Sequence, residues 1–333
     1  MKKLTTFALT AFLTCAWTVA AFASDVVVYS ARKEHLIKPL FDAYTDKTGV
    51  EIKYITGKAG ALLERIKAEG AGTPADLFIT VDAGNLWHAA EEGVLQAVDS
   101  KVLADNIPAH LRDPDNRWVG LSVRARTIVY NTNEVKPSEL STYEALGGPE
   151  WEGRLLLRTS KKVYNQSLVG SMIAEKGALE TEKIVKSWIP NLAVEPFNSD
   201  TKALEAVAAG VGDVTVVNTY YLGRLLDKNP DLPLAVFWPN QDTSGVHMNV
   251  SGAGVTKHAK NKAEAVKLLE WLSSEEAQGK FAALNFEYPA NDSVKPDPLI
   301  AAWGEFKGNP MNVAKYGEYQ APAIKLMDRA GYK

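Results

Sequence analysis

The sequence predicts an α/β protein of two lobes, in which doubly wound sheets are joined by crossover strands. Apolar runs typical of strands alternate with apolar residues at helical spacing in both halves of the chain. Two β-rich stretches, 118–131 and 245–255, interrupt this alternation and are expected to pass between the lobes. The 333 residues are 46% hydrophobic and 23% charged, which is ordinary globular composition and enough chain for two cores.

The first 23 residues are expected to be a signal peptide. A basic start, an apolar run and small residues at Ala21 and Ala23 favour cleavage after Ala23. The only cysteine, Cys15, lies in this segment, so the mature chain has neither a disulfide nor a thiolate metal site. We therefore expect a protein exported to the periplasm.

The first lobe is predicted from three strands, each followed by a helical pattern. Its strands are expected at 25–30, 51–55 and 75–82, and its helices over the residues around Leu36–Tyr44, around Leu62–Ile66 and at 85–92. Gly49 and Gly93 follow the first and third helical patterns, where glycine commonly ends a helix. This order is typical of a parallel, doubly wound sheet.

A second α/β unit is predicted to begin at 150–160. Helices are expected at 166–176, 180–188 and 201–209, then a strand at 212–217, and later two amphipathic helices at 262–273 and 275–284. We assign 24–122 and 252–303 to lobe 1, and 123–251 and 304–333 to lobe 2. A cleft between two such lobes is the natural place for a ligand.

Two adjacent tyrosines, Tyr220 and Tyr221, lie where the strand at 212–217 gives way to helical spacing. Packing of both rings into the core is one interpretation. A buried tyrosine, however, needs a partner for its hydroxyl group. Neighbours at a helix start are about 100° apart, so a bend here can direct both phenols to one point beyond the strand ends, where doubly wound folds bind ligands.

Tyr164 has a similar placement, in a loop that follows an expected strand and precedes a helix start at 165–167. A surface tyrosine in a turn is the alternative. Arg32 lies between the first strand and the first helix, where an arginine and the helix amides form an anion site. Arg124 and Arg126 alternate along a crossover stretch and are expected to face the cleft. Surface salt bridges are the competing interpretation for all three arginines.

Other functional classes find little support in the sequence. The five histidines are scattered without metal-site spacing, and neither a GxSxG elbow nor a Walker loop occurs. With 37 Lys and Arg against 40 Asp and Glu, and no basic run, nucleic acid is not an expected partner. The GAGV cluster at 252–255 is too weak a signal to assign a function.

The chain resembles the periplasmic ferric-iron-binding proteins of bacterial ABC importers, which are type 2 substrate-binding proteins with the two-lobed periplasmic-binding-protein fold (type II). The Asn-x-Tyr-Tyr element after a Gly-Asp strand is the specific part of this resemblance. The resemblance covers nearly the whole mature chain and includes VVVYSARKEHLIKPLFDAYTDKTG, TPADLFITVD, LSVRARTIVYN, WEGRLLLRTSKKVYNQSLV, AVAAGVGDVTVVNTYYLGRL, QDTSGVHMNVSGAGV and EYPAN.

The resemblance implies that Tyr220 and Tyr221 are ferric ligands and that Tyr164, in the VYN element, is a third phenolate. One subfamily uses a His and a Glu at positions that here are Lys33 and Gly60, neither of which suits Fe³⁺. Another has a His-Tyr pair where this chain has Lys33 and a glutamate. The chain is therefore closest to the three-tyrosine subfamily.

A synergistic anion such as carbonate or bicarbonate is expected to complete the metal site. Fe³⁺ is a small, hard cation that prefers anionic oxygen, and its charge removes the proton from a phenol with an ordinary pKa near 10. Three phenolates balance the charge of the metal, so the anion needs cations of its own. The expected anion-binding residues are Arg32, Arg124 and Arg126, and the remaining candidates for a further ligand are Glu34, His35 and Ser160.

The sequence thus predicts a monomeric binding protein without catalysis, which captures ferric iron in the interlobe cleft and delivers it to an ABC-type permease in the inner membrane. The first alternative is the same fold with an organic solute, such as a polyamine, thiamine or a phosphonate. A secreted hydrolase or metalloenzyme is the second alternative, and no nucleophile–base signature supports it.

Overall fold

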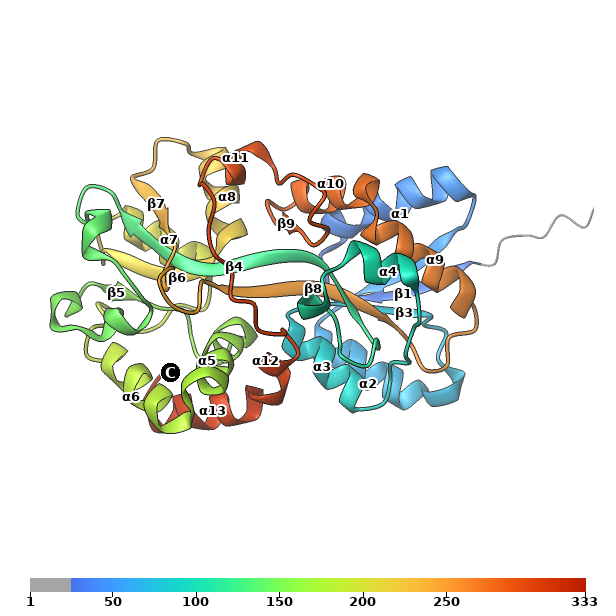
Figure 1. Cartoon of the computed structure of the whole chain (residues 1–333), viewed down its shortest axis with the longest axis horizontal. Coiled ribbons are helices and arrows are strands. Elements are labelled where there is room, and N and C mark those ends of the chain that lie inside the picture. The colour runs from blue at the N-terminus through green and yellow to red at the C-terminus, as the bar shows by residue number, and fades with distance from the viewer. Residues whose placement is uncertain (1–24) are drawn as a thin grey trace, which may run out of the picture.

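The computed structural model describes residues 25–333 (Figure 1). The predicted signal peptide, 1–23, and its cleavage point lie outside the described residues. Over 25–333, no helix combines the length and apolar character needed to cross a membrane.

One mixed sheet of nine strands extends through both halves of the molecule (Figure 1). Its order is β2-β1-β3-β8-β4-β6-β5, and β7 and β9 also pair with β4. The strands are β1 (Val26–Ser30), β2 (Ile52–Thr56), β3 (Leu77–Val81), β4 (Val119–Asn131), β5 (Leu155–Leu156), β6 (Val214–Asn218), β7 (Leu234–Phe237), β8 (His247–Val255) and β9 (Tyr288–Pro289).

The two longest strands, β4 and β8, connect the halves. β8 pairs antiparallel with β3 at one end and with β4 along most of its length, while β4 continues to pair with β6 and β7. In the first half β1 is parallel to β2 and β3, and in the second β5 is parallel to β6. The predicted two-lobed α/β fold with crossover strands is confirmed. The residue boundaries of the lobes, at 122/123, 251/252 and 303/304, stay predictions.

Helices cover both faces of each half (Figure 1). They are α1 (Glu34–Thr48), α2 (Ala59–Glu69), α3 (Ala83–Glu91), α4 (Lys101–Asn106), α5 (Val163–Lys176), α6 (Ala178–Trp188), α7 (Asp200–Ala208), α8 (Thr219–Lys228), α9 (Lys262–Ser273), α10 (Glu275–Ala283), α11 (Pro298–Ala301), α12 (Lys315–Glu318) and α13 (Gln320–Arg329). α1 ends where Gly49 adopts a left-handed conformation with φ 73°, as its position in the sequence predicts.

Each half of the molecule is stabilised by an apolar cluster of its own. In the first half, Ile37 and Leu40 of α1 pack on Val26 of β1 and Leu77 of β3, all fully buried. In the second, α5, α6 and α13 cover β4 and β6 with side chains such as Leu168. Each side chain of this size contributes about 1.5–3 kcal/mol when it is buried, so each half has a core of its own.

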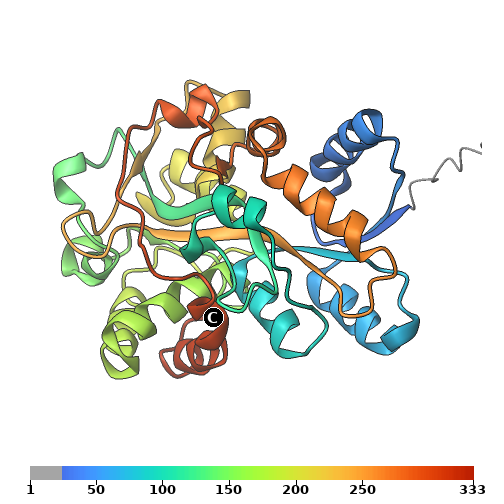
Figure 2. The same cartoon turned by 45° about the vertical axis from the view of Figure 1, so that its right-hand side comes forward.

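The C-terminal segment contacts both halves. Between α11 and α12 it runs across the crossover strands in both views (Figure 1 and Figure 2), and Gly308 forms a bridge with Val246 at the start of β8. α12 then packs against α3 and α5, and α13 packs against α5 and α6. The chain end therefore lies on the second half, and α12 joins it to the first.

The glycine cluster of β8 lets neighbouring segments of the chain approach this strand closely. A Cβ atom on Gly252 would lie 2.2 Å from the carbonyl oxygen of Val119 and 2.8 Å from Leu86 Cδ1. One on Gly254 would lie 2.5 Å from the carbonyl oxygen of Arg117. These glycines, to which the sequence assigned no function, are therefore needed for packing within the first half.

We expect Gly252→Ala to lower the free energy of unfolding by about 1–3 kcal/mol, because backbone atoms must move to admit the methyl group. Gly279→Ala in α10 is the matched control, since its Cβ would meet no atom within 4 Å. It should raise stability by about 0.5–1 kcal/mol through helix propensity. Urea unfolding of both variants measures the difference. Equal stability of Gly252→Ala and the wild-type protein would contradict the close approach.

Candidate metal centre

A cavity of about 240 Å³ lies between the N-terminal ends of α1, α5 and α8. It brings together the three predicted tyrosines and two of the predicted arginines. Its lining is Ala31, Arg32, Lys33, Leu36, Val81, Arg124, Lys162, Tyr164, Tyr220, Tyr221, Arg224, Asn285 and Glu287. The two halves of the chain both contribute to this wall.

Helix starts place all three tyrosines. Tyr220 and Tyr221 occupy the first turn of α8, immediately after β6, and their ring centroids are 4.4 Å apart. Tyr164 lies in the first turn of α5, which begins at Val163, earlier than the sequence predicted at 165–167. A helix N-terminus carries partial positive charge, so the starts of α5 and α8 favour negative charge on these phenols.

The surroundings of the cavity raise the pKa of two of its three phenols. Tyr164 and Tyr220 are buried, and Tyr221 is half-buried. Burial raises the pKa of Tyr164 and of Tyr220 above its ordinary value, and the negative charge of a neighbouring ionised tyrosine raises it further. Arg124 lowers both pKa values, but its effect is smaller. A cation bound to the oxygens of Tyr164 and Tyr220 would offset this cost of ionisation.

One buried carboxylate, Glu287, lies between Arg32 and Arg124. Arg32 Nη2 and Arg124 Nη2 are each 2.9 Å from one of its oxygens. Arg32 Nη1 also donates to Ser251 Oγ at 2.9 Å. Arg124 lines the cavity, and its Nε and Nη1 have no partner in the protein although the side chain is buried. The EYPAN motif contains Glu287, but no sequence pattern predicts that its carboxylate meets two arginines.

Three further cations surround the tyrosines. The Arg224 guanidinium lies 5.1 Å from the ring centroid of Tyr220 and 4.8 Å from that of Tyr221. Lys162 Nζ lies 4.7 Å from the ring centroid of Tyr164, and burial together with the charge of Arg158 lowers the pKa of Lys162. With Lys33, the cavity wall has five cationic side chains and one carboxylate, so it favours an anionic ligand beside any metal.

Four predicted site residues lie outside the cavity. Glu34 is exposed and accepts a hydrogen bond from Tyr54, and His35 is exposed as well. Ser160 is half-buried but does not line the wall. Every guanidinium nitrogen of Arg126 is bonded to groups of the protein interior. Arg126 is therefore occupied by partners within the protein and does not line the cavity, and Glu34, His35 and Ser160 do not line it either.

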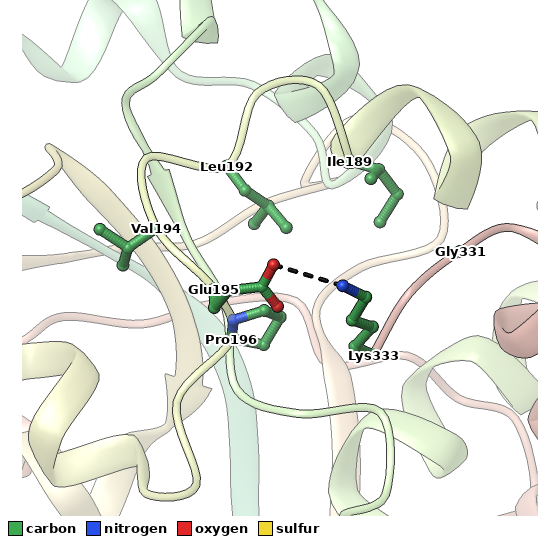
Figure 3. Close-up of a pocket in the computed structure, with 7 residues that line it drawn as sticks. All are labelled: Ile189, Leu192, Val194, Glu195, Pro196, Gly331 and Lys333. Atoms are coloured by element: carbon green, nitrogen blue, oxygen red, sulfur yellow. Dashed lines mark hydrogen bonds and ion pairs between the residues drawn. The ribbon is translucent and has the colours of Figure 1, made fainter.

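Two other hollows are at least as large but lack this chemistry. One of about 340 Å³ is lined mainly by apolar side chains around the Glu195–Lys333 ion pair (Figure 3). Another of about 270 Å³ has an apolar and aromatic lining that includes Tyr288 and Phe306. Within 25–333, no three His, Cys, Asp or Glu residues gather as a metal site. The tyrosine cavity is the one with the donor set for a hard cation.

Fold and cavity together define a two-lobed binding protein whose ligand site lies beside its crossover strands. The chain belongs to the bacterial extracellular solute-binding protein family, whose sequence profile matches residues 26–286. The resemblance to binding proteins of this type is thereby confirmed. A curated relative, Iron uptake protein A1 of Synechocystis sp., is 45% identical over 315 residues, which are 93% of this chain and 88% of the relative.

Solved structures agree with this relationship. A Trichodesmium protein in complex with iron and citrate ligands has a TM-score of 0.90 and 46% identity, and the match covers 93% of this chain and all of that one. Ferric iron-binding protein A of Mannheimia haemolytica, in an open conformation, has a TM-score of 0.88 and 35% identity, over 93% of this chain and 99% of that one. Both are similar to this chain over nearly its whole described length.

The buried carboxylate of Glu287 makes the stability of the fold depend on pH. Burial alone would raise its pKa, but Arg32 and Arg124, with hydrogen bonds from Arg32 and Ser122, outweigh burial and hold the pKa below its ordinary value of 4.5. A lowered folded-state pKa stabilises the fold above pH 4.5, and this contribution is lost as the pH falls through the folded-state value.

We expect Glu287→Gln to lower the free energy of unfolding at pH 7 by about 3 kcal/mol, because two buried arginines lose their counter-charge. The deficit should shrink below pH 4.5, as the wild-type carboxylate takes up a proton. Urea unfolding at pH 7 and at a pH below 4.5 measures the deficit in each condition. Glu318→Gln is the control, because its ion pair with Lys315 is exposed and contributes about 0–1 kcal/mol. A deficit independent of pH would contradict the buried ion-pair account.

Proposed function

We propose that this protein captures Fe³⁺ with Tyr164, Tyr220 and Tyr221 in the cleft and delivers it to an ABC-type permease. The observation that carries the proposal is that three tyrosines line one cavity. Phenolates are hard anionic donors that suit Fe³⁺, and three of them neutralise its charge. The names of the relatives, an iron uptake protein and a ferric iron-binding protein, support the same cargo.

The proposed site also includes a bound anion. Three phenolates leave part of an octahedral coordination shell open, and Arg124 Nη1 has no partner in the protein. The five cations of the wall favour an anion with more than one negative charge. Carbonate and citrate fit this description, bicarbonate becomes carbonate when it loses a proton, and the Trichodesmium relative is described with iron and citrate ligands. Arg32 holds Glu287 and thereby keeps Arg124 in place.

We propose a monomeric periplasmic protein without catalysis, whose lobes close over the iron. The proposal of closure rests on the two crossover strands, and the M. haemolytica relative is described in an open conformation. Iron that binds the closed form better would draw the lobes together. The predicted signal peptide and the name of a further relative, the Fe(3+)-binding periplasmic protein of Serratia marcescens, support this location.

An organic solute is the alternative cargo. A polyamine or thiamine would be repelled by the five cations of the wall. A phosphonate fits those cations, and a relative with 24% identity is named as a putative 2-aminoethylphosphonate-binding protein. A phosphonate would not need three phenols, however, so it leaves the central feature of the cavity without a role.

We expect Tyr164→Phe and Tyr221→Phe each to weaken iron binding more than about 100-fold, because a charged ligand is lost while the ring stays. Each should also change the visible phenolate-to-iron absorption band. Tyr130→Phe is the control, since Tyr130 is a buried tyrosine in the core of the second half. Iron titrations and visible spectra measure both effects. A Tyr164→Phe protein with wild-type spectrum and affinity would mean that the three-tyrosine site is wrong.

The same titrations with bicarbonate, with citrate and with neither anion test the anion proposal. Affinity should rise with one of them in the wild-type protein and should lose that dependence in Arg124→Gln. Binding should weaken as the pH falls, because protons compete with iron for the phenolate oxygens. Tight binding of 2-aminoethylphosphonate, with no coloured iron complex, would favour the alternative cargo instead.

A further inference from the structure

Three charged side chains, Arg126, Asp200 and Arg158, are buried behind the tyrosines and do not line their cavity. Arg126 lies on β4, Arg158 follows β5, and Asp200 is the first residue of α7. Asp200 Oδ1 accepts a hydrogen bond from Arg126 Nη1 at 3.1 Å, and Oδ2 pairs with Arg158 Nη1. Burying charges is costly and rarely improves stability over apolar packing, so the cluster invites a functional explanation.

Arg126 links the starts of the two helices that carry the tyrosines. Its Nε and Nη2 donate to Asn165 Oδ1 at 3.0 and 2.6 Å, and Asn165 is the neighbour of Tyr164 on α5. Its Nη1 donates to Asn218 Oδ1 at 3.1 Å. Asn218 is the residue before α8, and its Nδ2 donates to Tyr220 Oη at 3.2 Å. One guanidinium therefore fixes two helix starts against each other.

Arg158 extends the cluster to the third tyrosine. Its Nη1 donates to Tyr221 Oη at 3.4 Å, and its guanidinium carbon lies 5.6 Å from the ring centroid of Tyr164. The backbone oxygen of Arg158 accepts from Asn165 Nδ2 at 2.7 Å, which connects this arginine back to the start of α5. With two arginines and one aspartate, the cluster has a net positive charge directed toward the phenol oxygens.

We propose that Arg126, Asp200 and Arg158 are positioning residues that hold the three tyrosine oxygens at metal-binding separation, and that Arg158 donates a hydrogen bond to the Tyr221 oxygen while that oxygen binds iron. This inference rests on the proposed function. Residues behind a metal ligand fix its orientation, and their loss typically weakens metal binding 10–100-fold. A charge-assisted hydrogen bond also draws electron density away from the oxygen that accepts it.

The visible spectrum separates this role from a merely structural one. The band arises from transfer of an electron from phenolate to iron, so a phenolate that loses a hydrogen bond transfers its electron at lower energy. Loss of the Arg158 contact should therefore move the band to longer wavelength. A variant that is only less stable would lose absorbance in proportion to the unfolded fraction, without any change in wavelength.

The experiment compares Arg158→Gln and Arg158→Lys with Arg154→Gln in the full mature chain. Arg154, which lies just before β5, is the matched control, because its ion pair with Asp213 is partly exposed. We expect Arg158→Gln to bind iron about 10–100-fold more weakly, measured by competition with citrate, and to absorb at longer wavelength. Arg158→Lys keeps the charge and should recover part of both properties. Arg154→Gln should match the wild-type protein in both.

An Arg158→Gln protein with wild-type wavelength and affinity would overturn the inference. If Arg158→Gln does not fold, Arg158→Lys decides in its place: wild-type wavelength and affinity would again overturn it, because a lysine cannot reproduce the paired contacts of the guanidinium. Tyr221→Phe distinguishes failure of this inference from failure of the proposed iron site. If Tyr221→Phe loses iron while the Arg158 variants do not, only this inference fails. If Tyr221→Phe binds iron normally, the proposed site itself fails.

Discussion

Mutual repulsion among three phenolates is the constraint on which the rest of the site depends. Tyr164, Tyr220 and Tyr221 line a single cavity, where burial and neighbouring negative charge both oppose the ionisation of Tyr164 and Tyr220. A trivalent cation removes this opposition, because it supplies one positive charge for each phenolate. In this account the cavity recognises the charge of its cargo as well as its preference for oxygen.

The surrounding charges are arranged in two groups with different roles. On the side of the first half, Glu287 neutralises part of Arg32 and Arg124 and leaves Arg124 Nη1 for a bound anion. On the side of the second half, Asp200 pairs with Arg126 and Arg158 behind the tyrosine-bearing helices. The first group faces the proposed ligand. The second lies behind the tyrosines and, in our proposal, holds them in position. Each group contains one more cation than anion, so both favour the negative charge that accumulates on the oxygens around iron.

Much of the fold followed from the sequence because hydrophobic periodicity is a local signal. The strand–helix order of the first half, the crossover strands and the Tyr220–Tyr221 junction were all visible in short windows. Contacts between distant segments were not. Arg126 shares a strand face with Arg124, yet two residues along a strand span about 6.8 Å, which takes it past the cavity and into the interior of the second half. Glu287 meets arginines that are more than 160 residues away in the sequence, and no spacing rule could pair them. The sequence did not show why position 252 must be a glycine, because the carbonyl oxygen that a side chain there would meet, that of Val119, lies on another strand.

Resonance Raman spectroscopy of the iron-loaded protein, excited within its visible band, tests the central claim most directly. If phenolates bind the metal, tyrosine ring vibrations should be selectively enhanced. Their frequencies should shift when the protein is produced in cells supplied with ring-deuterated tyrosine. Enhanced vibrations that do not respond to tyrosine labelling, or a colourless protein that nevertheless holds one equivalent of Fe³⁺, would contradict the claim that phenolate oxygens hold the iron.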